Sequence, residues 1–338
     1  MFKLSLLLIF SLLNFFIVRN INFFSKKINI LDIPDKNRKL HSKPIFLGGG
    51  VLLYFNYILA VIINSYFQFS NNDLFLINDY RSFITWIVVP SALFAVGLID
   101  DKFDLGPFTK LVLLTIIYLF GIFADETLLI TEINLMSIDY IYYLGSFSIF
   151  FTLFSFLIFS NAFNMLDGID LNVGIYTLFV ISFILLRVNF NFILILILLS
   201  VMFFLFLNFK KKVFLGDSGA NLLSGLIAIL FIKNFNVNYL FKSDEILMIM
   251  LLPGLEIIRL FYLRILNKKN PFKADRNHLH YLILEKFKSR NIQHCTASGL
   301  INLIFLSFTC LFFFYKTIFL LFAATAFYFI LIRFLYKH

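Results

Sequence analysis

The sequence predicts an all-α polytopic membrane protein with about 10–11 transmembrane helices, and three observations support this fold class. Of its 338 residues, 61% are hydrophobic and only 14% are charged, whereas soluble domains average roughly 45–50% and about 25%. The mean hydropathy is +0.91. The apolar residues come in runs of about 20, the length that a bilayer-spanning helix needs. This composition excludes a water-soluble enzyme and a disordered chain, and two cysteines are too few for a secreted disulfide scaffold.

Eleven apolar runs are expected to span the bilayer. In chain order they cover residues 2–18, 49–66, 83–99, 109–123, 144–163, 173–187, 190–209, 221–235, 245–265, 298–315 and 317–336. A tight polar turn at Arg187 and Asn189 divides one long stretch into two runs. We expect the first run to be a retained helix rather than a signal peptide, because no small-residue cleavage site follows it before Arg19. Since no linker or repeat divides the chain, we expect a single domain over residues 1–338.

Lysine and arginine are distributed unequally between the two sets of alternating loops. One set carries 23 of the 29 basic residues and the other carries 6. The positive-inside rule assigns the richer set to the cytoplasm, with the N-terminus outside and the C-terminus inside. The net charge of +10 is attributed to this topology rather than to nucleic-acid binding. Eleven acidic residues and all five histidines fall on the same side, most of the acidic ones in short clusters, so we expect chemistry at the cytoplasmic face.

The first cluster is the pair Asp100 and Asp101, at the end of the run 83–99. Two adjacent carboxylates at a membrane boundary repel each other and are costly to desolvate, so a divalent cation or a cationic partner is expected. A solvated helix terminus is the alternative. Lys110 either faces the same site or extends its side chain to the interface.

The second cluster contains Asn161, Asn164, Asp167 and Asp170. If the preceding helix continues to Gly168, the first three residues share one helix face. Their amide and carboxylate oxygens suit a hard cation or the hydroxyl groups of a nucleotide. Helix capping next to a glycine explains one or two of these residues but not all four.

The third cluster is Gly216-Asp217-Ser218-Gly219, which follows Phe214 and a lysine triplet. The glycines allow close backbone approach, and the next helix presents its N-terminal amides to an anion. Asp217 suits Mg²⁺, which favours one or two carboxylates with phosphate oxygens and water. A plain turn is the alternative, and no Gly-Lys-Ser/Thr follows as in a Walker loop.

The fourth cluster, in the longest cytoplasmic loop, contains Arg276, His278 and His280. These side chains can hold a diphosphate, and a solvated loop is the equally weighted alternative. Residues two apart on a helix point to nearly opposite sides, so the two histidines are not a helical metal pair. Upstream, Glu256 and Arg259 are three apart and can pair with each other.

The fifth cluster runs from Asp32 to His41 and leads to three consecutive glycines, Gly48 to Gly50. Its basic residues can meet anionic lipid headgroups. The glycines are expected to allow tight packing at the start of the second span.

In their order and content, the five clusters resemble the polyprenyl-phosphate N-acetylhexosamine-1-phosphate transferase family. The matching pieces are Asp32-x-Pro34 with Arg38-Lys39-x-His41, Asp100-Asp101, Asn161-x-x-Asn164-x-x-Asp167-Gly168-Ile169-Asp170, Phe214-x-Gly216-Asp217-x-Gly219 and Asp275-Arg276-Asn277-His278-Leu279-His280. The resemblance covers the whole chain. It implies transfer of N-acetylhexosamine-1-phosphate from a UDP-N-acetylhexosamine to undecaprenyl phosphate with release of UMP, the initiating step of a cell-envelope polysaccharide such as lipopolysaccharide. It also implies a multi-pass protein of the bacterial inner (cytoplasmic) membrane, with its catalytic loops on the cytoplasmic face.

The resemblance also implies roles for single residues. Asp217 would be the main ligand of Mg²⁺, or of Mn²⁺ in its place, with Asn164 as a second ligand. Asp100 and Asp101 would handle the lipid phosphate, by orienting or deprotonating it or through the metal. The remaining residues implied to bind substrate are Asn161, Asp167 and Asp170 at the nucleotide sugar, Phe214 on the uracil, and Lys110, Arg276, His278 and His280 at phosphates. The oligomeric state stays open between a monomer and a homodimer.

The sequence departs from the family pattern at several positions. Leu171 replaces a glycine, Ala220 a serine and Tyr281 a third histidine, while Glu256 stands where an aspartate is common and Phe46-Leu47 replaces Pro-Arg. These changes leave the metal site intact and the donor open, and we expect a GlcNAc-like or deoxy-HexNAc donor. The main rival is a polytopic transporter, which needs polar or charged groups near mid-membrane. A lipid-binding scaffold without activity is the other.

Overall fold

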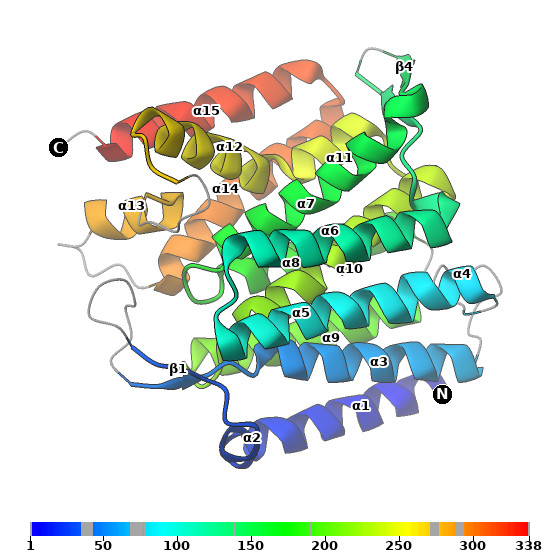
Figure 1. Cartoon of the computed structure of the whole chain (residues 1–338), viewed down its shortest axis with the longest axis vertical. Helices are drawn as coiled ribbons and strands as arrows, with labels where there is room; N and C mark the ends of the chain where they lie inside the picture. Colours follow the sequence, from blue (N-terminus) through cyan, green and yellow to red (C-terminus); the bar gives the residue numbers. More distant parts are fainter. Residues whose placement is uncertain are drawn as a thin grey trace. The chain divides into compact units, whose positions relative to one another are not determined.

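The computed structural model describes residues 2–34, 43–67, 77, 79–137, 139–188, 191–270, 277–287 and 294–336. These residues are mostly helical, with two short two-stranded sheets (Figure 1). The chain packs as two compact units, each built from two separate stretches of sequence. The first unit contains Met1–Leu105 and Val173–Leu223, and the second contains Gly106–Asn172 and Ser224–His338. The predicted all-α membrane class is confirmed.

The helices of the first unit correspond to the expected spans. They are α1 (Phe2–Arg19), α2 (Ile21–Ile28), α3 (Gly49–Phe67), α4 (Tyr80–Phe83), the π-helical turn η1 (Ile84–Val88), α5 (Val89–Phe103), α8 (Asn172–Arg187), α9 (Phe192–Phe209) and the start of α10 (Gly216–Asn236). Two short strands, β1 (Leu31–Asp32) and β2 (Ile45–Phe46), pair antiparallel.

The second unit contains the rest of α10 and the remaining spans. Its other elements are α6 (Pro107–Ala124), η2 (Glu126–Leu128), β3 (Glu132–Leu135), β4 (Tyr140–Tyr143), η3 (Gly145–Phe147), α7 (Ser148–Leu166), α11 (Ser243–Ile249), α12 (Leu251–Leu266), α13 (Leu279–Lys286), α14 (His294–Tyr315) and α15 (Ile318–Tyr336).

Every expected span is matched by a helix in the described part of the chain. Eight helices are long and apolar enough to cross a bilayer alone, and two more spans result if the bent pairs α1–α2 and α11–α12 each count as one. The remaining run is α8, a shorter apolar helix. The main boundary difference is α10, which begins at Gly216 instead of residue 221 and therefore includes Asp217 in its first turn.

Close backbone packing joins the helices of the first unit. A Cβ atom on Gly50 would lie 2.3 Å from the backbone nitrogen of Gly219, so only glycine allows α3 to approach the start of α10 this closely. This confirms the predicted tight packing at the start of the second span. Asn14 and Asn56, both buried, exchange side-chain hydrogen bonds of 3.1 and 2.7 Å between α1 and α3. Such bonds hold helices together where no water is present.

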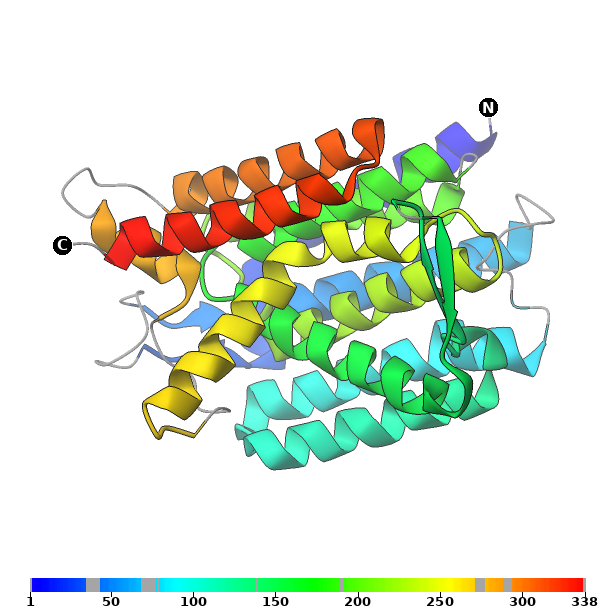
Figure 2. The same ribbon diagram turned by 90° about the horizontal axis from the view of Figure 1, so that it is seen from above.

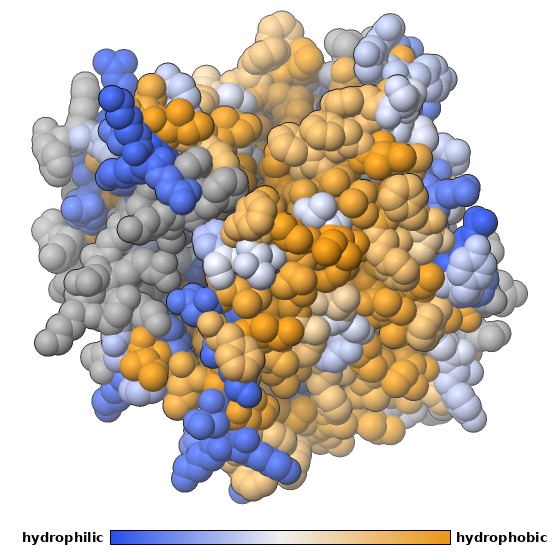
Figure 3. All heavy atoms as spheres, viewed as in Figure 1, coloured by the Kyte–Doolittle hydropathy of each residue, from blue (hydrophilic) through white to orange (hydrophobic). Residues whose placement is uncertain are grey.

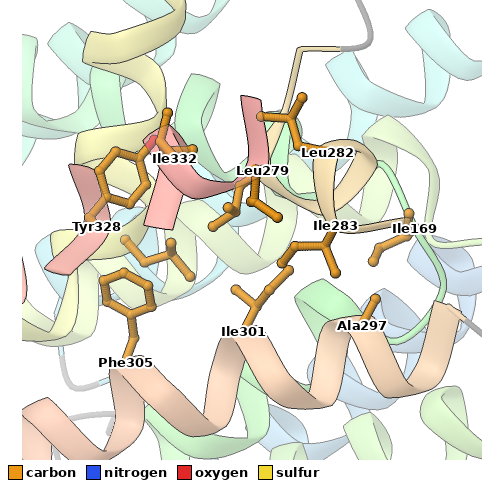
Figure 4. Close-up of a cluster of buried hydrophobic side chains, with 11 residues drawn as sticks. Ile169, Leu279, Leu282, Ile283, Ala297, Ile301, Phe305, Tyr328 and Ile332 are labelled. Atoms are coloured by element: carbon orange, nitrogen blue, oxygen red, sulfur yellow. The ribbon is translucent and has the colours of Figure 1, made fainter. Parts of the chain in front are cut away.

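An apolar cluster near one end of the second unit brings its polar loops together. Ile169, in the loop after α7, and Leu279, at the start of α13, belong to one buried cluster with residues of α14 and α15 (Figure 4). Ile169 separates Gly168 from Asp170, and Leu279 separates His278 from His280. Burial of these two apolar side chains therefore anchors both polar segments to the same core.

The opposite end of α7 carries loops of the predicted outer side. Lys233 and Asp125 form a buried ion pair of 2.6 Å, and Asp244 accepts hydrogen bonds from the backbone amides of Met136 and Ser137 beside the β3–β4 hairpin. Figure 2 shows this hairpin and α13 at opposite ends of the helices of the second unit. The second unit therefore separates the two predicted sets of loops.

The outer surface of α6 and α7 suits contact with lipid. Ile116, Phe120 and Phe123 on α6, and Phe150 and Phe154 on α7, are all at least half exposed. Figure 3 shows predominantly apolar side chains over these helices. Because hydrocarbon offers no hydrogen bonds, such faces lose nothing by contact with a bilayer.

Candidate functional site

The carboxylate of Asp101 lies at the N-terminus of α10. Its Oδ1 accepts a hydrogen bond of 2.7 Å from the backbone amide of Asp217, and its Oδ2 accepts one of 3.0 Å from that of Ser218. Gly216 turns the chain into α10 with φ +73, and a Cβ atom there would lie 2.7 Å from Oδ2 of Asp101. The sequence predicted an anion at these helix amides, and one such anion is the protein's own Asp101.

The neighbouring Asp100 makes a different contact. Its Oδ1 accepts a hydrogen bond of 2.7 Å from the backbone amide of Leu105, and the residue is only 9% exposed. Asp104, with φ 52, ends α5 in the left-handed conformation. Asp100 therefore closes the turn after α5, while Asp101 joins α5 to α10. The predicted role of both residues at the lipid phosphate stays a prediction.

Residues 45–50, which include the glycines that follow the fifth cluster, hold the segment before α10 in place. Phe46 and Val213 form a parallel β-bridge, and the amide of Phe214 donates to the carbonyl of Phe46 at 2.9 Å. The amides of Gly49 and Gly50 donate to the carbonyls of Phe214 and Leu215, both at 2.9 Å. Clusters one and three thus meet the glycines Gly49 and Gly50 in the first unit. No local sequence pattern indicated this pairing. The motif residues 35–42 lie outside the described chain.

The polar end of the first unit fits a magnesium ion that is shared with a substrate. Within the described residues, no group of three or more His, Cys, Asp or Glu could hold a metal ion. Mg²⁺ does not need such a group, because it usually binds one or two carboxylates together with water and substrate phosphates. Asp217, half-buried in the first turn of α10, supplies one carboxylate, and its backbone amide is bonded to Asp101. Asn164, the predicted second ligand, belongs to the second unit, and its part in metal binding stays a prediction.

The second cluster lies where α7 ends. The helix ends at Leu166, and Asp167 is its C-cap with φ −78 and ψ 35, so the helix does not continue to Gly168. Asn161 and Asn164 remain three apart on α7, and Asp167, three residues further on, is the residue at which the helix ends. The side chain of Asn172 donates to the carbonyl of Leu166 at 2.9 Å and so satisfies one of the helix's last carbonyls.

The fourth cluster packs against the second. His278 precedes α13 and His280 lies in its first turn, with their rings stacked at 5.3 Å between centroids. A Cβ atom on Gly168 would lie 2.1 Å from Nε2 of His280, and the hydroxyl of Tyr281 donates to the carbonyl of Gly168 at 3.0 Å. His278 and His280 are 6% and 2% exposed, so the two histidines do not lie in a solvated loop, which was the alternative interpretation.

Two further predicted site residues belong to the second unit. Asp170 is half-buried in the same loop as Asp167. Lys110 is half-buried in the first turn of α6. Arg276 lies outside the described residues.

The predicted pair of Glu256 and Arg259 is confirmed, with 2.8 Å between Oε1 and Nη2.

The conformation of Leu171 suits the glycine that the family pattern has at this position. Leu171 has φ 70, in the left-handed region, which costs a residue with a Cβ roughly 1–2 kcal/mol. Leu171→Gly is therefore expected to raise the free energy of unfolding by about 1 kcal/mol, since glycine's greater unfolded-state entropy offsets part of the gain. Thermal unfolding in detergent, followed by the fluorescence of Trp86, measures the change.

A matched control is Leu303→Gly, the same exchange at an exposed position inside α14. It is expected to lower the free energy of unfolding by about 1 kcal/mol, because glycine is a poor helix former. If both variants lose stability equally, the left-handed conformation of Leu171 carries no strain.

Similarity to known proteins covers several of the polar clusters described above. Residues 83–234 match the sequence model of glycosyl transferase family 4. The chain is 26% identical to the undecaprenyl-phosphate alpha-N-acetylglucosaminyl 1-phosphate transferase of Salmonella typhi, over 78% of this chain and 72% of that protein. It is 28% identical to the enzyme of that name from Thermotoga maritima (82% and 80%), and 27% identical to the one from Escherichia coli strain K12 (83% and 76%).

The matched region includes Asp101, Asp217 and the loop after α7, whereas α12 and α13 lie outside it. These relatives carry the name of a transferase and not of a transporter. Over residues 83–234 the chain is therefore similar to glycosyl transferase family 4, and along most of its length it is similar to these transferases.

Proposed function

We propose that this protein is a polyprenyl-phosphate sugar-1-phosphate transferase, which uses undecaprenyl phosphate as acceptor and a UDP-N-acetylhexosamine as donor. An oxygen of the lipid phosphate forms a bond to the β-phosphorus of the donor. The bond between that phosphorus and the bridging oxygen breaks, and the bridging oxygen leaves with UMP. The product is undecaprenyl-diphospho-N-acetylhexosamine.

One observation carries the proposal. The polar clusters of a highly apolar chain, far apart in sequence, come together at helix ends in each unit, as Asp101 does with α10 and His280 with Gly168. The three similar proteins compared above, which align with most of the chain, are named as undecaprenyl-phosphate alpha-N-acetylglucosaminyl 1-phosphate transferases. Polar groups at helix ends suit a reaction between a lipid in the bilayer and a charged nucleotide in the cytoplasm.

The proposed site lies at the cytoplasmic face of a bacterial inner membrane. The lipid acceptor reaches it from within the bilayer, and the multiply charged donor reaches it from the cytoplasm. This assignment rests on the basic residues of the predicted cytoplasmic loops. A homodimer is compatible with the proposal and is not needed for it.

The side chains divide into a metal-binding group and a substrate-binding group. Asp217, in the first unit, would hold Mg²⁺, while the role of Asn164, in the second unit, as a ligand stays a prediction. Bound Mg²⁺ supplies neutralisation of the donor diphosphate and of the leaving UMP. Asp101 keeps the first turn of α10 in position through two backbone amides, and thereby orients Asp217. His278 and His280, which belong to the second unit, hold phosphates of the donor.

The other predicted substrate contacts are distributed over the two units. Asp167, Asp170 and Asn161 bind the nucleotide-sugar region, Phe214 stacks on uracil, and Lys110 and Arg276 bind phosphate. The acceptor needs little activation, since a phosphate monoester has a second pKa of about 6 and is already a nucleophile near neutral pH. Positioning of the two phosphates, rather than general-base catalysis, is therefore the main contribution of these residues.

The proposal predicts which label moves into lipid. Purified protein in proteoliposomes is given undecaprenyl phosphate, Mg²⁺ and UDP-GlcNAc labelled either in the sugar or with ³²P in the β-phosphate. Both labels are expected in the butanol-extractable lipid, in equal molar amounts, with one UMP released for each lipid formed. A panel of UDP-N-acetylhexosamines, including deoxy sugars, then identifies the preferred donor.

Three controls separate this reaction from its rivals. Sugar label in the lipid with β-³²P left in UDP would indicate transfer of the sugar alone and would contradict the proposal. Uptake of the donor into the vesicle lumen without labelled lipid would indicate a transporter. EDTA is expected to stop transfer, and restoration by Mg²⁺ or Mn²⁺ identifies the metal.

A further inference from the structure

We infer that Glu256, Arg259 and Tyr328 form a buried positioning unit that sets the placement of His278 and His280 for donor binding. This inference rests on the proposed function for its kinetic consequence and on the geometry alone for its structural one. None of the three residues belongs to the five polar clusters.

The three side chains form a compact polar network inside the second unit. They are 2%, 6% and 0% exposed, respectively. Arg259 donates from Nη2 to Oε1 of Glu256 at 2.8 Å and from Nε to the hydroxyl of Tyr328 at 2.8 Å, and that hydroxyl also donates to Oε2 of Glu256. The network therefore links α12 to α15, which are separated by about 70 residues in sequence.

The same network forms hydrogen bonds with the backbone on both sides of His278. Oε1 of Glu256 accepts a hydrogen bond of 2.7 Å from the amide of Leu279, and Nη2 of Arg259 donates to the carbonyl of Asn277 at 2.7 Å. Nδ1 of His278 lies 3.9 Å from Oε1 of Glu256. The peptide groups on both sides of His278 are thus held by charged side chains from α12, and charge-assisted hydrogen bonds are stronger than neutral ones.

The position of this segment also determines the loop after α7. His280 packs on the backbone of Gly168, and Tyr281 donates to the carbonyl of Gly168. Ile169 and Leu279 share the buried apolar cluster shown in Figure 4. A shift of residues 277–281 would therefore also move the loop that carries Asp167 and Asp170.

Stability alone does not account for this arrangement. Replacing a buried ion pair with well-packed apolar side chains is often neutral or stabilising, so a buried pair is weak support for stability. An apolar group in place of Glu256 or Arg259 would, however, have no bond to offer the amide of Leu279 or the carbonyl of Asn277. The feature that only the charged network supplies is a defined register for the histidine segment.

The test compares Tyr328→Phe with Tyr57→Phe. The first variant removes one hydroxyl from the network and leaves Glu256 and Arg259 paired. The second removes the hydroxyl of an equally buried tyrosine in the first unit, which donates to the carbonyl of Trp86. Tyr328→Phe is expected to raise the KM for the UDP-sugar about tenfold, since a lost bond to charged groups is worth about that factor. Its kcat and its KM for undecaprenyl phosphate are expected to change by less than about twofold.

Hydrogen exchange provides a readout that does not need activity. In Tyr328→Phe, amides in peptides covering residues 277–287 are expected to exchange at least about fivefold faster than in the wild type, because Glu256, the acceptor of the Leu279 amide, is no longer held by the hydroxyl of Tyr328. Peptides from the β3–β4 hairpin are expected to be unchanged. Tyr57→Phe is expected to leave both regions, and the donor KM, as in the wild type.

The outcomes separate this inference from the proposed function. If the wild type transfers no sugar phosphate from any donor, the proposed function fails, while exchange in residues 277–287 still decides the structural inference. Equal donor KM and equal exchange in the two variants would overturn the positioning role. A lower melting temperature, together with a lower kcat and a higher KM for both substrates, would also overturn the positioning role, because it would indicate general destabilisation. Glu256→Asp, which keeps the carboxylate, is expected to retain more donor affinity than Glu256→Gln.

Discussion

Asp217→Asn is expected to lower kcat by about 10³-fold and to leave the protein folded, because removing the carboxylate removes several kcal/mol of metal-dependent stabilisation of the reacting phosphates. The amide has nearly the same size and keeps the first turn of α10 intact. The lost charge also interacts with the helix dipole, so a small loss of stability, about 0.5 kcal/mol, is expected in addition. Initial rates of UMP release at several Mg²⁺ concentrations measure the effect.

The matched control for this variant is Asp104→Asn, an exposed aspartate at the C-cap of α5 in the same unit. It loses the same charge and is expected to keep transfer within about twofold of the wild-type rate. Wild-type activity of Asp217→Asn with an unchanged Mg²⁺ requirement would show that Asp217 is not the metal ligand. In that case the carboxylates of the second unit would be the next candidates.

Asp101→Ala is expected to lower both stability and activity. The variant leaves the amides of Asp217 and Ser218 at the start of α10 without their acceptor, at a cost of about 2 kcal/mol. Since the first turn of α10 carries Asp217, a displacement of about 1 Å there is expected to lower kcat about 10²-fold. Thermal unfolding in detergent and kcat under saturating substrates measure the two effects.

Asp100 provides the comparison, because its carboxylate accepts a hydrogen bond from the amide of Leu105, which is five residues further along the chain. Asp100→Ala removes one local bond and is expected to cost about 1 kcal/mol of stability. If Asp101→Ala unfolds at the wild-type temperature and still loses activity, Asp101 acts on substrate directly and not through α10. If Asp100→Ala is the more damaging to stability, the assignment of the joining role to Asp101 is wrong.

The transmembrane helices were predictable because the signal for them is local. A backbone segment in hydrocarbon must satisfy its own hydrogen bonds, so each long apolar run becomes a helix whatever its neighbours are. All eleven expected runs correspond to helices. The errors were at ends, where α10 begins at Gly216 and α7 stops at Leu166. Both ends depend on side chains that reach them from elsewhere, such as Asp101 and Asn172.

The residue types of the polar clusters were also readable in the chain. Carboxylates, amides and histidines are rare in so apolar a sequence, so their grouping at the ends of runs indicated sites. The pairing of Glu256 with Arg259 followed from helical spacing. The network that these two residues form with Tyr328 and the backbone of Leu279 did not follow, because its members are 23 to 72 residues apart.

Composition and periodicity were enough to establish a helical membrane protein, its spans and the residues with chemical potential. Folding in three dimensions assigned the partners: Asp101 to the first amides of α10, 116 and 117 residues away, and Tyr281 to Gly168, 113 residues away. It also put Leu171 in a left-handed conformation that no propensity favours. Helix formation depends on bonds within a few residues of the chain, whereas these contacts depend on which helices pack side by side, and that choice leaves no local pattern to read.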